Sequence, residues 1–212
     1  MFVRPVHQYR PFESGPGGRA HRQGSRIALA AFLLLLPAFA FISNACGGDD
    51  DDAGSGTAGK TAADLSPDLK SLGFTVAQSG KAAGSTQNQD AYTTQYAGSG
   101  GKVTAARTDI NLHPSVDAAT QQYNAISEAL RNPPPDLFGA NATQDDNTTL
   151  FKADQGKSYK TTKADSQGVR VFTDVYRMGR AVVIVYVIGA DGADTDAVRK
   201  KAAEEISSKA PK

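Results

Sequence analysis

The sequence predicts an α+β fold: a mostly antiparallel β-sheet with two main helices packed on it. Two observations support this prediction. Segments with alternating or continuous apolar residues occur in two groups, and each group is followed by a segment whose apolar residues recur every three or four positions. Because strands, helix, strands and helix fit within a single-domain length of about 100–200 residues, we expect one domain.

Three strand candidates make up the first group, separated by segments rich in Gly and Ser. In the second candidate, Tyr92 and Tyr96 share one face of the expected strand. The tight connection GSGG joins this candidate to the third. The order predicts an antiparallel meander. The three candidates are residues 71–78, 90–98 and 102–112.

The first helix is expected after Ser115 and before three consecutive prolines at 133–135. Ser115 is a typical N-cap residue, and an acid such as Asp117 is favourable in the first turn. The prolines end the helix because they cannot donate backbone hydrogen bonds. The residues expected to face inward are Val116, Ala119, Tyr123, Ile126 and Leu130.

The second group ends in the clearest hairpin of the sequence, residues 168–189, with its turn at 178–180. Residues 182–188 are apolar on both faces, which indicates a central strand with packing on each side. A C-terminal helix is expected after Asp194 or Thr195. Two shorter strand candidates precede the hairpin, at 149–154 and 158–165, and the inward residues of the last helix are Val198, Ala202 and Ile206.

Residues 1–45 are expected to be a signal peptide. A head with five arginines precedes the uncharged run 27–42, and small residues follow, which is the three-part pattern of export signals. As a helix, this run would span about 24 Å, less than the roughly 30 Å of a hydrocarbon core. Pro37 would weaken a spanning helix further. The run therefore favours export over a permanent membrane span.

Cys46 is the only cysteine, and it follows the apolar run where the chain would leave the membrane. Exported proteins tend to use cysteines in pairs, so a single thiol needs another explanation. With Ala45 before Cys46, the segment resembles bacterial lipoprotein signal sequences. The resemblance implies a diacylglyceryl group, palmitate for example, on Cys46 of the cleaved protein. Ordinary signal cleavage, after Ala40 or Ala45, and an uncleaved anchor are the alternatives.

Residues 46–64 are expected to form a flexible tether between the anchor and the domain at 65–212. The tether is rich in Gly, Asp and Ala and has no apolar periodicity, so it cannot bury enough surface to order itself. Two acyl chains hold a protein stably on a membrane. We therefore expect a domain attached to the cell membrane on its extracytoplasmic face.

The charge balance argues against nucleic acid as a partner. The leader carries five of the 23 basic and one of the 22 acidic residues, so 18 basic and 21 acidic residues remain. Four of those acids are Asp49–Asp52, which we interpret as a solvated spacer. The basic residues are scattered and form no stripe that could follow a phosphate backbone.

We expect no metal, no cofactor and no enzymatic activity. His113 is the only histidine outside the leader, and no thiol or elbow-type serine lies near it in the sequence. Zinc sites require Cys or His ligands in spaced pairs. The acids Asp191, Asp194 and Asp196 lack the late Glu of an EF-hand loop, and we interpret them as turn and cap residues.

Aromatic side chains with polar ends and arginines on neighbouring strands suit a sheet face that contacts a ligand. Ordinary packing would explain the same residues, so both interpretations stay open. The candidate ligand-binding residues are Tyr92, Tyr96, Arg107, Arg170, Phe172 and Tyr176.

The layout of residues 65–210, chiefly VDAATQQYNAISEAL and GRAVVIVYVIG, resembles small extracytoplasmic domains of actinobacterial and Chloroflexi-type lipoproteins. It resembles PsbP/Mog1-like sandwiches and the outer sensor domains of some bacterial kinases more loosely. The resemblance implies a non-enzymatic binding or sensing domain that acts through its sheet face or loop 132–149. The alternative is a structural or assembly accessory that engages a protein partner. A wall hydrolase has the least support because catalytic groups are missing.

Overall fold

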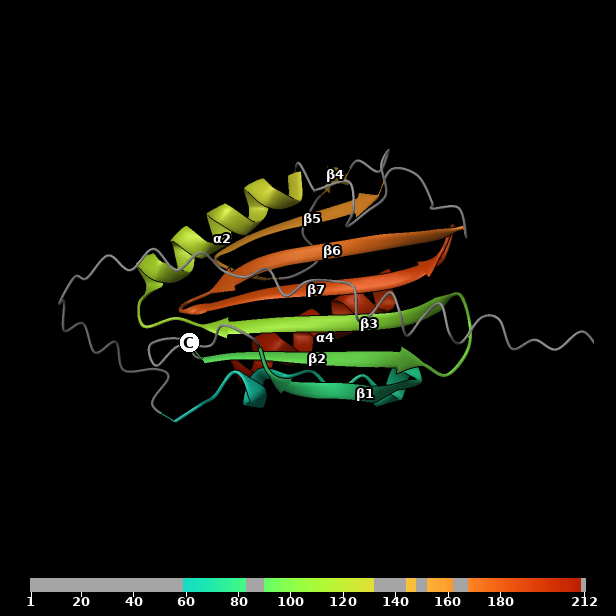
Figure 1. Cartoon of the computed structure of the whole chain (residues 1–212), viewed down its shortest axis with the longest axis horizontal. Helices are drawn as coiled ribbons and strands as arrows, with labels where there is room; N and C mark the ends of the chain where they lie inside the picture. The colour runs from blue at the N-terminus through green and yellow to red at the C-terminus, as the bar shows by residue number, and fades with distance from the viewer. Residues whose placement is uncertain (1–58, 83–89, 132–143, 148–151, 162–167, 211–212) are drawn as a thin grey trace, which may run out of the picture. The chain divides into compact units, whose positions relative to one another are not determined.

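The computed structural model describes residues 59–82, 90–131, 144–147, 152–161 and 168–210, with the backbone alone for 144–147. The expected signal peptide, Cys46 and most of the expected tether lie outside these residues, as does most of loop 132–149. The described part is an α+β domain, as predicted: a seven-stranded antiparallel sheet with a helix on each side (Figure 1). No helix of the described residues is long and apolar enough to span a membrane.

The strand order is β1-β2-β3-β7-β6-β5-β4, and every pair is antiparallel. The two halves of the chain meet where β3 pairs with β7, so the middle of the sheet joins segments that are far apart in sequence. The strands are β1 (Phe74–Lys81), β2 (Asp90–Gly98), β3 (Val103–Leu112), β4 (Gln144–Asn147), β5 (Gln155–Thr161), β6 (Val169–Met178) and β7 (Ala181–Ala190).

The predicted meander is confirmed, with a later start for its first strand. Residues Lys70–Leu72 form a 3-10 turn, and Gly73 ends this turn with a left-handed φ of 79°. Glycine adopts this left-handed conformation without steric cost. The turn occupies the residues before Phe74, so β1 begins only there. A bulge between Val76 and Gln78 interrupts its pairing with β2.

The hairpin at 168–189 is confirmed, and β7 is buried along both faces except at Ala190. Its turn is made by Gly179, with φ 54°, and Arg180. The two shorter strand predictions were wrong in their bounds. β5 starts three residues before the second candidate and includes its residues 158–161, whereas residues 152–154 of the first candidate are not strand; the other residues of both candidates lie outside the described part. β4 lies in the segment expected to be loop. Both strands are short and polar, so their pairing defines them, β5 with β6 of the hairpin and β4 with β5.

The first helix, α2 (Val116–Arg131), begins where predicted, and the Oγ of Ser115 accepts a hydrogen bond from the Ala118 amide at 3.1 Å. Val116 was expected to face inward but is 47% exposed. The last helix, α4 (Asp196–Lys209), has Thr195 at its N-cap. The inward residues predicted for α4 are all buried.

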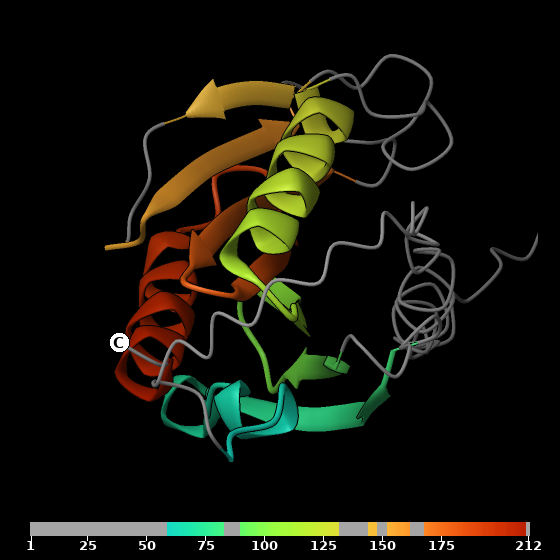
Figure 2. The same ribbon diagram turned by 90° about the vertical axis from the view of Figure 1, so that its left-hand side faces the viewer.

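The two helices lie on opposite faces of the sheet (Figure 2). We call these the α4 face and the α2 face. The α4 face is closed by α4 together with residues 59–73, which we call the strap. Ala62 of the strap is fully buried, so the packed part of the chain reaches into the segment assigned to the tether. The core on this face includes Leu65, Leu69, Phe74, Tyr96, Ile110, Tyr176, Val183, Val185, Val198, Ala202 and Ile206.

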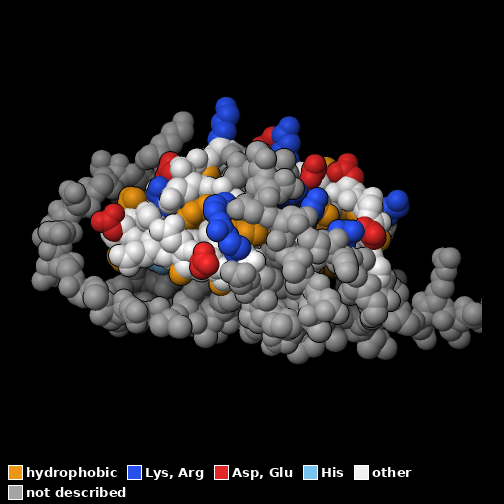
Figure 3. Space-filling model, turned by 90° about the horizontal axis from the view of Figure 1, so that it is seen from above, with side chains coloured by type: hydrophobic (Ala, Val, Ile, Leu, Met, Phe, Trp, Pro, Cys, Tyr) orange, Lys and Arg blue, Asp and Glu red, His pale blue; other side chains and the backbone are white. Residues whose placement is uncertain are grey.

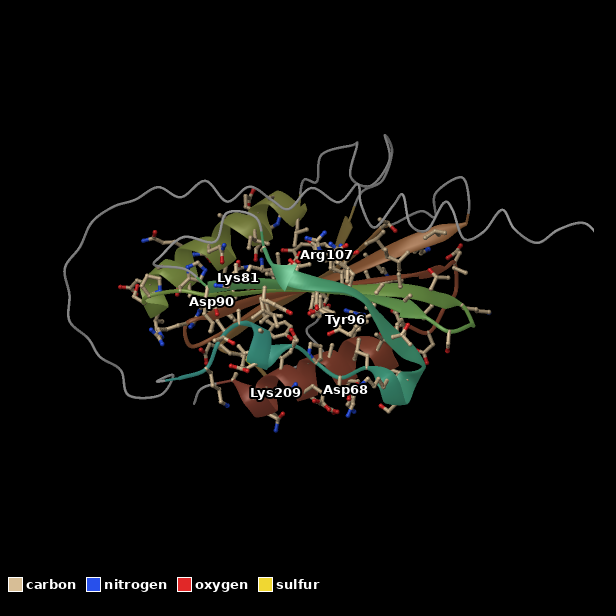
Figure 4. All side chains as sticks on the ribbon, turned by 60° about the horizontal axis from the view of Figure 1, so that its bottom comes forward. Asp68, Lys81, Asp90, Tyr96, Arg107 and Lys209 are labelled. Atoms are coloured by element: carbon tan, nitrogen blue, oxygen red, sulfur yellow. The ribbon has the colours of Figure 1, made fainter. Side chains whose placement is uncertain are left out.

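Hydrogen bonds hold the strap in place along its length. The Ala62 amide donates to Asp90 of β2 at 2.5 Å, and the Lys209 ammonium donates to the Ser66 carbonyl at 2.5 Å. Near the start of the strap, the Lys60 ammonium donates to the Lys209 carbonyl at 2.5 Å. The strap therefore joins β2 to the end of α4 (Figure 4).

Candidate functional site

Four of the six ligand candidates belong to the core of the α4 face or pack against it. The hydroxyl of Tyr96 donates to the Pro67 carbonyl of the strap at 2.8 Å, and burial raises the pKa of Tyr96 to about 12. Tyr176 is fully buried, and burial raises its pKa well above the ordinary value. Tyr92 and Phe172 pack against the same core. Their aromatic surface is used in packing.

Phe172 lies beside a buried ion pair that fixes α4 to β6. The carboxylate of Asp174 accepts from Arg199 with both oxygens, at 2.5 and 2.8 Å, and the two side chains are 1% and 6% exposed. The guanidinium lies 5.7 Å from the centre of the Phe172 ring. Burial lowers the pKa of Arg199, but hydrogen bonding and the charge of Asp174 outweigh it and raise this pKa. Both carboxylate oxygens of Asp174 thus accept hydrogen bonds from Arg199, and the remaining Nη1 of Arg199 donates to Asp196.

Arg170 lies at the rim of the same face. Its Nε is 2.5 Å from the Asp191 carboxylate, and its Nη1 donates to the Thr161 carbonyl at 2.8 Å. These contacts tie β6 to the turn after β7 and to the end of β5. Asp191 therefore has the turn role that the sequence predicts.

Arg107 is the one candidate on the α2 face, away from Tyr96 (Figure 4). Its Nε donates to Oδ1 of Asp109 at 2.9 Å, and the same oxygen accepts from the Thr93 hydroxyl at 2.7 Å. The guanidinium lies over the Tyr186 ring, 5.9 Å from its centre. Gln95 is the register partner of Arg107 on β2. We call these five residues the Arg107 cluster.

The cluster belongs to a polar row that crosses the sheet. Gln95 on β2 pairs with Arg107 on β3, Arg107 pairs with Tyr186 on β7, and Tyr186 pairs with Thr173 on β6. Burial and the nearby Asp109 charge raise the pKa of Tyr186, while Arg107 lowers it less. The Tyr186 phenol therefore keeps its proton under ordinary conditions.

The α2 helix covers part of this face. It packs on β4, β5, β6 and β7, and the Tyr159 hydroxyl of β5 donates to the Ser127 carbonyl of α2 at 3.0 Å. Among the described elements, no helix lies over β1 and β2 on this side. The Arg107 cluster thus stands where the cover provided by α2 ends.

Two groups of the cluster keep hydrogen-bonding capacity. Both contacts to Asp109 use Oδ1, so its Oδ2 has no hydrogen-bond partner within the described residues. The Gln95 side-chain amide likewise has no partner there, and it is half-buried. Asp109 is 13% exposed, compared with 7% for Arg107. The arrangement can accept and donate hydrogen bonds at fixed positions.

His113 shows no catalytic arrangement among the described residues. Its Nε2 is hydrogen-bonded to the Gln122 amide of α2, and burial lowers its pKa while Gln122 partly offsets this shift. Asp194 accepts from the Asp196 amide at the start of α4, so it acts as a cap residue. Within the described residues, no group of three or more His, Cys, Asp or Glu side chains could hold a metal ion.

Sequence reasoning selected Arg107 but missed Thr93, Gln95, Asp109 and Tyr186. A signal was present: positions 93 and 95, and positions 107 and 109, alternate in polarity on the second face of each strand. Only the strand register shows that these pairs lie side by side.

Seen from above, the described side chains include both basic and acidic groups, which lie among uncharged ones (Figure 3). This view supplies no charged patch that competes with the Arg107 cluster as a candidate site.

No family model matches this chain, and no curated protein matches its sequence. Among solved structures, the chain is similar to the extracellular domain of PknH from Mycobacterium tuberculosis. The identity is 10%, the TM-score is 0.42, and the match covers 66% of this chain and 68% of that chain. A similarity this low carries no functional argument, so the site is interpreted from the residues of this chain.

Proposed function

We propose that this chain is a non-enzymatic binding or sensing domain on the extracytoplasmic face of the cell membrane, held there by a diacylglyceryl group on Cys46. The Arg107 cluster carries the binding part of the proposal. It is a fixed polar group at the border of the region that α2 covers, and Asp109 Oδ2 has no hydrogen-bond partner within the described residues. Preorganised polar groups of this kind give a site its orientation and specificity.

The anchor is tested in cells that export the protein. Radiolabelled palmitate should label the wild-type chain and not Cys46→Ser, and the wild type should stay with the membrane after a high-salt wash. Absence of label in the wild type would remove the anchor from the proposal. Recovery of the wild type in the cytosol would remove the extracytoplasmic location.

The binding role is tested by a small-molecule thermal-shift screen on the full-length protein, compared with a pull-down from solubilised membranes. A ligand that raises the melting temperature of the wild type, and not that of Gln95→Leu, supports binding at the cluster. Binding that is unchanged in Gln95→Leu moves the site elsewhere.

An accessory role with a protein partner is the second candidate, and the edge of β1 favours it. Val76 is 53% exposed and Leu72 is 38% exposed, and both lie on or beside this edge strand. Edge strands offer unpaired backbone groups to another chain. A reproducible partner in the pull-down, lost in Val76→Lys and accompanied by no ligand shift, would favour this role.

A further inference from the structure

The charge of the Arg107 cluster restricts what can bind to it. The cluster contains one guanidinium and one carboxylate in contact at 2.9 Å, so its net charge is zero. A cation would compete with Arg107 for a carboxylate that is already balanced. An anion would have to approach Arg107 beside Asp109, which is the more exposed of the two. Both kinds of charged ligand are therefore disfavoured relative to a neutral one.

The hydrogen-bonding groups restrict the ligand further. Asp109 Oδ2 accepts only, so the ligand must supply a donor at this point. The Gln95 amide both donates and accepts. Gln95 pairs with Arg107 and Asp109 pairs with Thr93, so Gln95 and Asp109 are diagonal neighbours whose Cα atoms lie about 7–8 Å apart. A ligand that meets both needs donors and acceptors spread over several ångströms.

Several hydroxyl groups on one ring or chain satisfy this requirement because each one donates and accepts. The Oδ1 atom of Asp109 is fixed by Thr93 and Arg107, and Arg107 is held over the Tyr186 ring. The acceptor therefore needs little reorganisation when a hydroxyl arrives. The floor of the site is built before the ligand binds.

We propose that the Arg107 cluster binds a neutral, hydroxyl-rich ligand of the saccharide class, with Asp109 Oδ2 accepting from one hydroxyl and the Gln95 amide contacting another hydroxyl of the same ligand. This proposal rests on the binding function proposed above and specifies its ligand. Arg107 and Thr93 act as positioning residues, since they hold the carboxylate.

The test uses the full-length protein in a zwitterionic detergent without a sugar headgroup, applied to an array of neutral and acidic oligosaccharides. The wild type is expected to bind neutral members, with dissociation constants then measured by calorimetry for the best of them. Asp109→Asn and Gln95→Leu should each weaken this binding about tenfold, which is the loss of one strong hydrogen bond. Gln121→Leu, at an exposed position of α2, is the matched control and should bind like the wild type.

If Asp109→Asn destabilises the fold, Gln95→Leu still tests the proposal, because Gln95 is not part of the Arg107–Asp109 ion pair. Binding to acidic oligosaccharides alone would overturn the proposal, as would neutral binding that both variants retain, or no binding to the array. A peptide or amide ligand that shifts the wild type and not Gln95→Leu would also overturn the saccharide class. That last result would contradict the saccharide class of the ligand but not the proposed binding function, so failure of one proposal can be told apart from failure of the other.

Discussion

The two faces of the sheet each hold an Arg–Asp pair, and the pairs differ in how fully they are satisfied. On the α4 face, Arg199 meets both oxygens of Asp174, and the carboxylate is 1% exposed. On the α2 face, Arg107 meets one oxygen of Asp109, which is 13% exposed. The same two residue types thus fasten a helix on one face and, among the residues that the structure describes, leave one carboxylate oxygen without a partner on the other.

The largest effect is expected from Asp174→Asn. Removing the Asp174 charge leaves the buried Arg199 with only the exposed Asp196 as a charged partner, and we expect the free energy of unfolding to fall by about 3–5 kcal/mol. Urea denaturation followed by circular dichroism measures this loss. Asp109→Asn on the other face should cost clearly less, because its pair is more exposed. Equal losses for the two variants would contradict the comparison.

A loss of about 2–4 kcal/mol is expected from Leu65→Ala in the strap, because the side chain is fully buried and its removal leaves a cavity. Leu72→Ala is the matched control within the strap. Leu72 is 38% exposed, so its truncation should cost about 0.5 kcal/mol or less. Similar values for the two variants would show that the strap does not close the α4 face.

Tyr159→Phe should cost about 1 kcal/mol, since it removes the hydroxyl that bonds α2 to β5 and leaves the Ser127 carbonyl with one donor fewer. Tyr96→Phe makes the equivalent change on the α4 face, at the strap. Comparable losses would indicate that α2 is held as firmly as the strap. A much smaller loss for Tyr159→Phe would mark α2 as the more weakly held cover.

The smallest effect concerns pH. Burial lowers the pKa of His113 in the folded state below its ordinary value of 6.5, so the unfolded chain binds the proton more readily. The free energy of unfolding should therefore fall as the pH drops through about 6.5 and below. Urea titrations at pH 8 and pH 5.5 should show a larger difference for the wild type than for His113→Gln. An identical pH dependence would rule out this contribution.

Much of the fold could be predicted from local pattern. The meander, α2, the hairpin and α4 follow from apolar spacing, Ser115 at a helix start and Gly179 in a turn. The edges were harder to predict. β4 and β5 carry little apolar signal, and their pairing defines them, β5 with β6 and β4 with β5. Val116 fits the helical period but is exposed, since periodicity alone does not locate the sheet that a helix covers.

The candidate site divides in the same way. Arg107 and Arg170 were candidates because arginines on strands next to polar-ended aromatics suit a ligand-contacting face, and Tyr92, Tyr96, Phe172 and Tyr176 were equally suitable. The structure places those aromatics in or against the core of the α4 face. Strand register then adds Thr93, Gln95, Asp109 and Tyr186 to Arg107, from three strands.

The sequence by itself determined the meander, the two helices and the hairpin, with the turns and caps that bound them, and it places a basic leader and an apolar run before a single cysteine. Those properties depend on neighbours along the chain. Tertiary structure decided which face each side chain occupies relative to the helices, and hence that Arg199 meets both oxygens of Asp174 while Asp109 Oδ2 has no partner within the described part of the chain. That outcome depends on the pairing of β3 with β7 across about 70 residues of sequence, which no local pattern encodes.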